Sequence, residues 1–146
     1  MPTGGCLCGG VRFEVDGALG PVVYCHCSQC RRASGSAFAT NASVRADAFR
    51  LRAGTELVCE YESSPGQFRA FCGRCGSPLY ARMGAWPGLR RVRLGSFDGD
   101  PGRRPEAHVH VGSKAPWVEL CDGLPRFDAE GAPALVAPGE REPGTR

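Results

Sequence analysis

Cysteine placement constrains this 146-residue chain more than any other feature, because seven of its nine cysteines fall into three tight clusters. The clusters are Cys6-Leu-Cys8, Cys25-His-Cys-Ser-Gln-Cys30 and Cys72-Gly-Arg-Cys75. Disulfides would suit a secreted protein, but the number of cysteines is odd and the N-terminus lacks the pattern of a secretory signal. Because a Cys-x-x-Cys turn brings two thiolates within reach of one zinc ion, the clusters favour metal binding.

Counting the clustered thiols distinguishes two kinds of zinc site. Seven thiolates cannot fill two closed four-cysteine sites, so one site keeps an open position. A closed site is structural, whereas an open site can bind water or substrate and act as a Lewis acid. The natural partition forms the closed site from the first and last pairs, Cys6, Cys8, Cys72 and Cys75. The open site is then formed by the middle cluster, Cys25, Cys27 and Cys30.

Spacing alone leaves other partitions open. One pair from the middle cluster could join Cys72 and Cys75 instead. A second closed site could also be completed by His26, Cys59 or Cys121, although each of these has a simpler interpretation. We expect His26 to hydrogen-bond a sulfur or the backbone, and the two lone cysteines to be small buried hydrophobic residues.

Charge and hydropathy exclude several classes of protein. The net charge is +3, from 18 basic and 15 acidic side chains that form no long run of one sign. This is too weak a basic character to indicate nucleic-acid binding. No stretch approaches the roughly 20 apolar residues that a membrane span requires. We therefore expect a cytoplasmic protein without nucleic-acid or membrane partners, and of undetermined oligomeric state.

Short alternating segments separated by Gly, Pro, Ser and Asp predict a mainly β fold. The clearest strand lies within 9–17, where Val11, Phe13 and Val15 share one face. Further strands are expected at 22–24, 37–40, 57–61, 68–71, 79–81, 92–94 and 108–111. A short helix is expected from Ser28, as its N-cap, to Gly35. These elements predict small antiparallel sheets with one or two short helices, in a domain over 1–128 followed by a loose tail over 129–146.

Four motifs carry a resemblance to a known family. They are Gly4-Gly-Cys-Leu-Cys-Gly-Gly-Val-Arg-Phe, Cys25-His-Cys-Ser-Gln-Cys-Arg-Arg-Ala-Ser-Gly35, Phe71-Cys-Gly-Arg-Cys-Gly-Ser-Pro-Leu-Tyr80 and His110-Val-Gly-Ser-Lys-Ala-Pro-Trp117. In this order they resemble the glutathione-dependent formaldehyde-activating enzyme family, which includes the centromere protein V domain. The resemblance implies a β-tent fold, stapled by a structural zinc at Cys6, Cys8, Cys72 and Cys75. It implies a catalytic zinc, which we expect to be labile, at Cys25, Cys27 and Cys30.

The family's reaction joins formaldehyde to the thiol of glutathione, giving S-hydroxymethylglutathione, and is classed as a carbon–sulfur lyase reaction. The resemblance thus implies a zinc-dependent lyase acting on a glutathione adduct or a related thiol adduct. Arg31 and Arg32 are candidate contacts for the glutathione carboxylates, because a guanidinium group matches a carboxylate. Lys114, in the family-like segment that ends at Trp117, is a further candidate contact for the substrate. The alternative is a zinc-stapled β module that binds a small ligand or partner without catalysis, in which the middle cluster is redox-sensitive.

Overall fold

The computed structural model describes residues 1–131, and most of the expected loose tail over 129–146 lies outside them. The described residues form one α-helix, α1 (Ser28–Ser34), three short 3-10 helices and ten strands, which confirms the mainly β prediction. The strands are β1 (Thr3–Gly5), β2 (Arg12–Val15), β3 (Val22–Cys25), β4 (Ala39–Arg45), β5 (Phe49–Ala53), β6 (Val58–Ser64), β7 (Gln67–Cys72), β8 (Pro78–Met83), β9 (Trp86–Arg93) and β10 (Pro105–Val109). No helix in 1–131 is long and apolar enough to cross a membrane.

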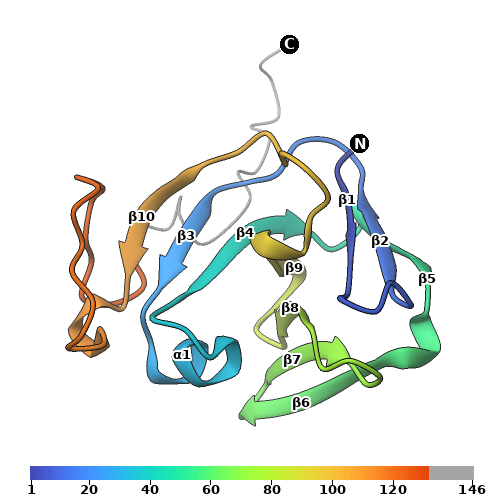
Figure 1. Cartoon of the computed structure of the whole chain (residues 1–146), viewed down its shortest axis with the longest axis horizontal. Coiled ribbons are helices and arrows are strands. Elements are labelled where there is room, and N and C mark those ends of the chain that lie inside the picture. The colour runs from blue at the N-terminus through green and yellow to red at the C-terminus, as the bar shows by residue number, and fades with distance from the viewer. Residues whose placement is uncertain (132–146) are drawn as a thin grey trace.

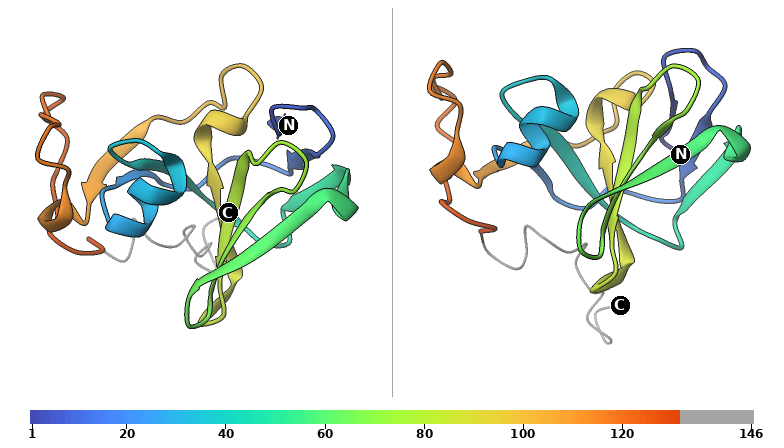
Figure 2. Two further views of the ribbon diagram at one scale, coloured as in Figure 1. Left: turned by 60° about the horizontal axis from the view of Figure 1, so that its bottom comes forward. Right: turned by 90° about the horizontal axis from the view of Figure 1, so that it is seen from below.

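Two sheets of unequal size make up the fold (Figure 1). The smaller has the order β1-β2-β5, and the larger has the order β10-β3-β4-β9-β8-β7-β6. β10 and the segment after it lie at one end of the molecule, and the smaller sheet lies at the other end in all three views (Figures 1 and 2). The connection between β9 and β10 is long enough to return the chain, so β10 pairs with β3 in parallel, whereas the other pairs are antiparallel.

The two faces of the larger sheet differ in chemistry, because side chains alternate along each strand. Val22, Ala42, Val44 and Val92 point to the face that packs on Phe13 and its neighbours in the main hydrophobic core. The residues between them point to the other face. That face carries the buried polar side chains of Asn41, Ser43 and Arg93, and we call it the polar face. It also holds a second, smaller apolar cluster, which includes Val23, Cys25, Cys30, Ala39, Ala107 and Val109.

The main core joins the two sheets and reaches the first and last cysteine pairs. Phe13 is 1% exposed and packs against the rings of Phe49 and Phe97, at centroid distances of 5.1 and 5.3 Å. Cys6 and Cys72 belong to the same cluster of buried residues. One cysteine of each of these pairs is therefore anchored in the main core, whereas Cys8 is exposed and Cys75 is partly buried.

Local expectations fail at several positions. α1 is capped by Cys27 and not by Ser28, since the Cys27 sulfur accepts a hydrogen bond from the Cys30 amide at 3.3 Å. The sequence patterns also missed β1 and β5, of which β1 is only three residues long and contains two glycines. Cys59 and Cys121 are exposed, so the expectation that both are buried is wrong.

Gly54 holds the loop of the first cysteine pair against β5, and this position predicts a large effect of substitution. Its φ is +75°, and an added Cβ would lie 2.1 Å from the carbonyl oxygen of Gly10. We expect Gly54→Ala to lower the free energy of unfolding by more than about 3 kcal/mol, because backbone strain and a backbone clash add. Gly66 is a matched control, since its φ is +76° but no atom lies within 4 Å of an added Cβ. Gly66→Ala should cost only about 1 kcal/mol in urea unfolding, and equal costs for the two variants would contradict this account.

Candidate metal centres and adjoining cleft

The first and last cysteine pairs meet in space although 64 residues separate Cys8 from Cys72. The sulfurs of Cys6, Cys8, Cys72 and Cys75 all lie within 4.8 Å of one another. The Cys6 and Cys8 sulfurs are 3.5 Å apart, and the Cys8 and Cys72 sulfurs are 3.9 Å apart. Four sulfurs at about 2.3 Å from a tetrahedral zinc ion would be about 3.8 Å apart. The four sulfurs therefore have the spacing that one zinc ion requires.

Backbone geometry presents these sulfurs in two matching loops. The Gly9 amide donates to the Cys6 carbonyl at 3.0 Å, and the Gly76 amide donates to the Cys72 carbonyl at 2.7 Å. Both glycines have positive φ, so each closes a tight turn around its pair. The Val11 amide also donates to the Cys6 sulfur at 3.2 Å, as expected of amides around a metal-bound thiolate.

Ser77 links the two loops, and sequence reasoning missed it. Its hydroxyl accepts a hydrogen bond from the Leu7 amide at 2.8 Å and lies 3.3 Å from the Cys75 sulfur. Hydrogen bonding to the side chain and then the backbone of Ser77 lowers the pKa of Cys75 to about 5. The loop thus favours a thiolate at Cys75, which is the form that binds zinc.

The middle cluster forms a second group of three sulfurs. Those of Cys25, Cys27 and Cys30 lie within 4.8 Å of one another, and this group includes no fourth ligand atom from the described residues. Cys25 ends β3, Cys27 caps α1, and Cys30 lies in the first turn of the helix. The junction between β3 and α1 therefore determines the positions of the three sulfurs. A trio of this kind suits a zinc ion with one open position.

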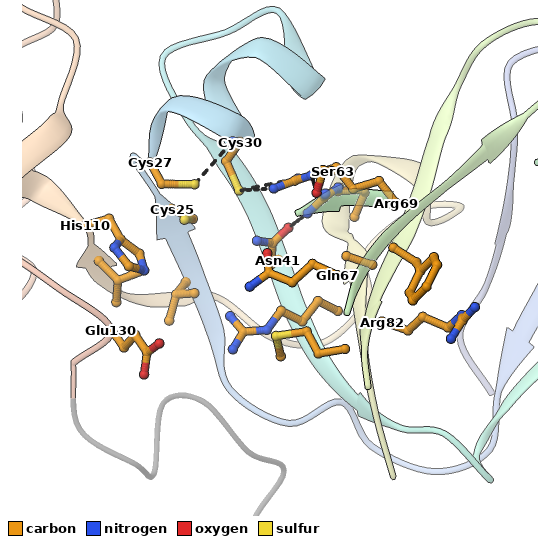
Figure 3. A pocket seen from close by; sticks show the side chains of 17 residues that line it. Cys25, Cys27, Cys30, Asn41, Ser63, Gln67, Arg69, Arg82, His110 and Glu130 are labelled. Atoms are coloured by element: carbon orange, nitrogen blue, oxygen red, sulfur yellow. Dashed lines mark hydrogen bonds between the residues drawn. The ribbon is translucent and has the colours of Figure 1, made fainter. Parts of the chain in front are cut away.

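Arg69 extends from β7, a strand far from the middle cluster in sequence, toward the Cys30 sulfur. Its Nη1 and Nη2 atoms lie 3.8 and 3.9 Å from the Cys30 sulfur (Figure 3). The guanidinium is held in place by Ser63, whose hydroxyl accepts from Nε at 3.0 Å, and by Gln29, whose carbonyl accepts from Nη2 at 3.3 Å. Arg69 thus joins the β6–β7 hairpin to α1 at the sulfur cluster.

Cys30 is the most acidic thiol of its cluster. Hydrogen bonds from the Cys25 and Cys27 thiols hold the pKa of Cys30 far below its usual value. The positive charges of Arg93 and Arg69 lower that pKa further. Hydrogen bonding to Cys27 and then to Cys30, together with burial, raises the pKa of Cys25 well above its usual value. Without a metal, the cluster therefore keeps thiol protons between its sulfurs, and a divalent cation would replace them.

A cleft opens beside the three sulfurs and is partly open to solvent. It lies over the polar face of the larger sheet, and Figure 3 shows the three cysteines at one end. His110 and Glu130 lie on one side of the cleft, away from Arg69. The remaining charged lining residues come from three neighbouring strands and are Arg69, Arg82, Arg91 and Arg93.

Two buried histidines and an exposed aspartate form a hydrogen-bonded chain beside the middle cluster. The Nε2 atom of His26 lies 2.8 Å from Nδ1 of His108, and Nε2 of His108 lies 2.8 Å from the Asp122 carboxylate. Since the carboxylate must accept, His108 donates from Nε2, and its Nδ1 accepts from His26. Desolvation, followed by the charge of His108, lowers the pKa of His26 to about 4, so its ring is neutral at neutral pH. His26 is therefore engaged with His108 and does not complete the sulfur group.

His108 should stabilise the fold through this chain. We expect His108→Leu to lower the free energy of unfolding by about 1–3 kcal/mol, because His26 would lose the acceptor for a fully buried N–H group. His108→Gln keeps an amide oxygen that can accept this hydrogen bond, so it should lose less stability. Urea unfolding of both variants measures the difference. Leucine and glutamine variants of equal stability would show that the hydrogen bond contributes nothing.

His108 and His110 do not share a strand face as the alternating pattern predicts. β10 ends at Val109, and His110 adopts a left-handed conformation with φ 55°. His108 therefore points into the buried chain, while His110 lines the cleft. Trp117, which ends the fourth family motif, is 71% exposed and lies outside the core. Nearby Ala115 is fully buried in its place.

The three residues expected to contact glutathione do not line the cleft. Arg31 and Arg32 lie in the last turn of α1, and the Arg31 Nε is buried without a hydrogen-bond partner in the described chain. The Lys114 ammonium donates to the carbonyls of Ala115 and Val118, at 3.1 and 2.6 Å. Their role in binding glutathione stays a prediction. The arginines that do line the cleft stand alone in the sequence and carry no local motif.

The fold and these clusters define a class of small, mainly β protein in which two separate groups of cysteine sulfurs have spacings suited to zinc. The sequence profile of the family described as glutathione-dependent formaldehyde-activating enzyme matches residues 1–113. The chain belongs to this family, as its motifs suggested. Membership supports a glutathione-related, formaldehyde-activating function.

One solved structure is similar to this chain over most of its length. It is the crystal structure of a Rhodobacter sphaeroides protein, with a TM-score of 0.59 and 27% sequence identity. The match covers 70% of this chain and 97% of that chain. Nearly the whole of that protein therefore shares this arrangement of strands.

Proposed function

We propose that this protein is a zinc-dependent carbon–sulfur lyase-type enzyme that joins formaldehyde to the thiol of glutathione, or acts on a closely related thiol adduct. The observation that carries the proposal is the group of three sulfurs from Cys25, Cys27 and Cys30 at the end of an open cleft. Family membership supplies the class of substrate. The four-sulfur group is proposed to hold a separate, structural zinc ion.

The difference between the two sulfur groups supports this division of roles. A four-thiolate group fills the coordination of zinc, so it stabilises the fold and leaves no position for a substrate. A three-thiolate group leaves one position free, and here that group faces the cleft. Among residues 1–131, the middle cluster therefore combines an incomplete metal site with access for a small molecule.

The reaction forms one carbon–sulfur bond and requires no oxidant. The thiol sulfur attacks the carbonyl carbon of formaldehyde, the π electron pair moves to the oxygen, and the proton lost by the thiol is gained by that oxygen. Zinc, when bound, supplies Lewis-acid chemistry that polarises the aldehyde or lowers the pKa of the thiol. Cys25, Cys27 and Cys30 would hold the ion, and Arg69 would fix the Cys30 sulfur through its two donors.

Selective removal of the zinc ion at the middle cluster tests the proposal. A mild chelator should remove the zinc of the middle cluster first, because that site supplies three protein ligands and the other supplies four. Exchange between formaldehyde and S-hydroxymethylglutathione, followed by NMR, should then fall to the uncatalysed rate and recover when zinc is added back. The far-ultraviolet circular dichroism should not change. Unchanged exchange after loss of that zinc would contradict catalysis and favour the binding module.

A further inference from the structure

Three arginines gather on the polar face of the larger sheet, beside the middle cysteine cluster. Arg91 and Arg93 lie two residues apart on β9 and point to the same face. Arg91 pairs with Ala81 on β8, and Ala81 pairs with Arg69 on β7. Directly paired residues share a face of the sheet, so Arg91 and Arg69 flank the small side chain of Ala81. The small residue leaves space between two guanidinium groups inside the cleft.

These arginines lack carboxylate partners, unlike several others in the described chain, although Arg69 and Arg93 interact with the Cys30 sulfur. Arg12, Arg45 and Arg52 each form an ion pair with a carboxylate. Arg82, at the far end of the cleft, likewise pairs with Glu60 at 2.5 Å. None of the ion pairs between described residues involves the arginines around Ala81, which are Arg69, Arg91 and Arg93.

Two of the three guanidinium groups are also poorly satisfied. The Arg91 Nε is buried and has no hydrogen-bond partner among residues 1–131. Arg93 is only 9% exposed, and the acceptor recorded for it is the neutral side-chain oxygen of Asn41. Burying a charge without a counter-charge is strongly unfavourable. A ligand that supplies negative charge would remove this cost.

With zinc bound to the middle cluster, the charged groups around the cleft carry a net positive charge. Three thiolates and one zinc ion carry one net negative charge, and Glu130 on the cleft wall carries another. The arginines around Ala81 carry three positive charges, so one has no counterpart. A carboxylate is the smallest common group that supplies the missing charge and matches the planar donors of guanidinium.

We propose that Arg69, Arg91 and Arg93 form a carboxylate-binding subsite around Ala81, so the substrate is a thiol or thiol adduct that carries a carboxylate. The sulfur end of the substrate faces the middle cysteine cluster, and its carboxylate lies between Arg69 and Arg91. The inference rests on the proposed function for the orientation of the substrate. The subsite itself is testable by binding alone, without turnover.

The test compares two S-methylated probes, which cannot react with formaldehyde and are weak zinc ligands. They are 3-(methylthio)propionate and 3-(methylthio)propan-1-ol, which differ in the carboxylate. NMR titration of the zinc-loaded full chain should give at least about tenfold tighter binding of the carboxylate probe, from charge-assisted hydrogen bonds. Arg91→Gln should remove most of this preference. Arg90→Gln is the matched control, since Arg90 lies next on the same strand but points to the opposite face.

A second variant tests the same space without removing an arginine. Ala81→Glu would place a tethered carboxylate between Arg69 and Arg91, and it should abolish the preference for the carboxylate probe. Equal binding of the two probes, absence of measurable carboxylate binding, or an equal loss in Arg90→Gln and Arg91→Gln would overturn the proposal. If the carboxylate preference holds but thiol-adduct exchange is absent, the subsite stands and the proposed catalysis fails. Exchange without any carboxylate preference gives the reverse conclusion.

Discussion

Cys72→Ser is expected to unfold the domain and release its structural zinc. Cys72 is fully buried in the main core, and its sulfur belongs to the group that joins the first loop of the chain to the β7–β8 turn. Structural zinc contributes about 10–16 kcal/mol of apparent binding free energy in small zinc domains, which is comparable with the entire stability of a typical domain, about 5–15 kcal/mol. Thermal unfolding followed by circular dichroism should show no cooperative transition in the variant.

Cys59→Ser is the matched control for Cys72→Ser. Cys59 lies on β6, is exposed, and belongs to neither sulfur group. A surface substitution of this kind should change the free energy of unfolding by no more than about 0.5 kcal/mol. A cooperative transition in Cys72→Ser at the temperature of the control would show that the four-sulfur group does not hold the fold together.

Cys27→Ser is expected to abolish turnover while leaving the fold intact. The substitution removes one of three thiolates, but the serine hydroxyl can still cap α1 by accepting from the Cys30 amide. The protein should bind one zinc ion per chain in place of two. Exchange of the thiol adduct should fall by more than about 100-fold, because even partners beyond the metal ligands are commonly worth 10–100-fold.

Two controls separate loss of metal from loss of structure. Cys27→Ala should also lose one zinc ion, and it should be about 1 kcal/mol less stable than Cys27→Ser because the helix loses its cap. Cys121→Ser changes an exposed thiol outside both sulfur groups and should keep full activity. Wild-type exchange in Cys27→Ser, or loss of both zinc ions and of the fold, would contradict separate roles for the two groups.

The sequence predicted those parts of the site and fold that are formed by residues close together in the chain. Cys27 and Cys30 lie within one turn of each other, so their meeting at one site follows from a short segment. The strand at β2 and the end of α1 at Gly35 were likewise predictable from alternation and from a glycine stop. The meeting of the first and last cysteine pairs was the natural partition of the thiols, although spacing alone left other partitions open, and the family resemblance implied it. The structure brings their four sulfurs together as the natural partition required.

The cleft could not be predicted because its residues meet only through sheet register. Arg69 and Arg91 are brought to either side of Ala81 by the pairing of β7, β8 and β9, and no sequence spacing signals that pairing. The contact between His26 and His108 likewise spans 82 residues. In a chain rich in arginine, single residues such as these carry no local signal. Arg31 and Arg32 were predicted as glutathione contacts because they directly follow the cysteine motif that ends at Cys30.

Anomalous scattering at the zinc absorption edge tests the central claim most directly. Crystals of the zinc-loaded protein should show two zinc ions per chain. One should lie among the sulfurs of Cys6, Cys8, Cys72 and Cys75, and the other among those of Cys25, Cys27 and Cys30. The second ion should have an open position that faces the cleft. A single ion, or a second ion closed by a fourth protein ligand, would contradict the division into a structural centre and a reactive one.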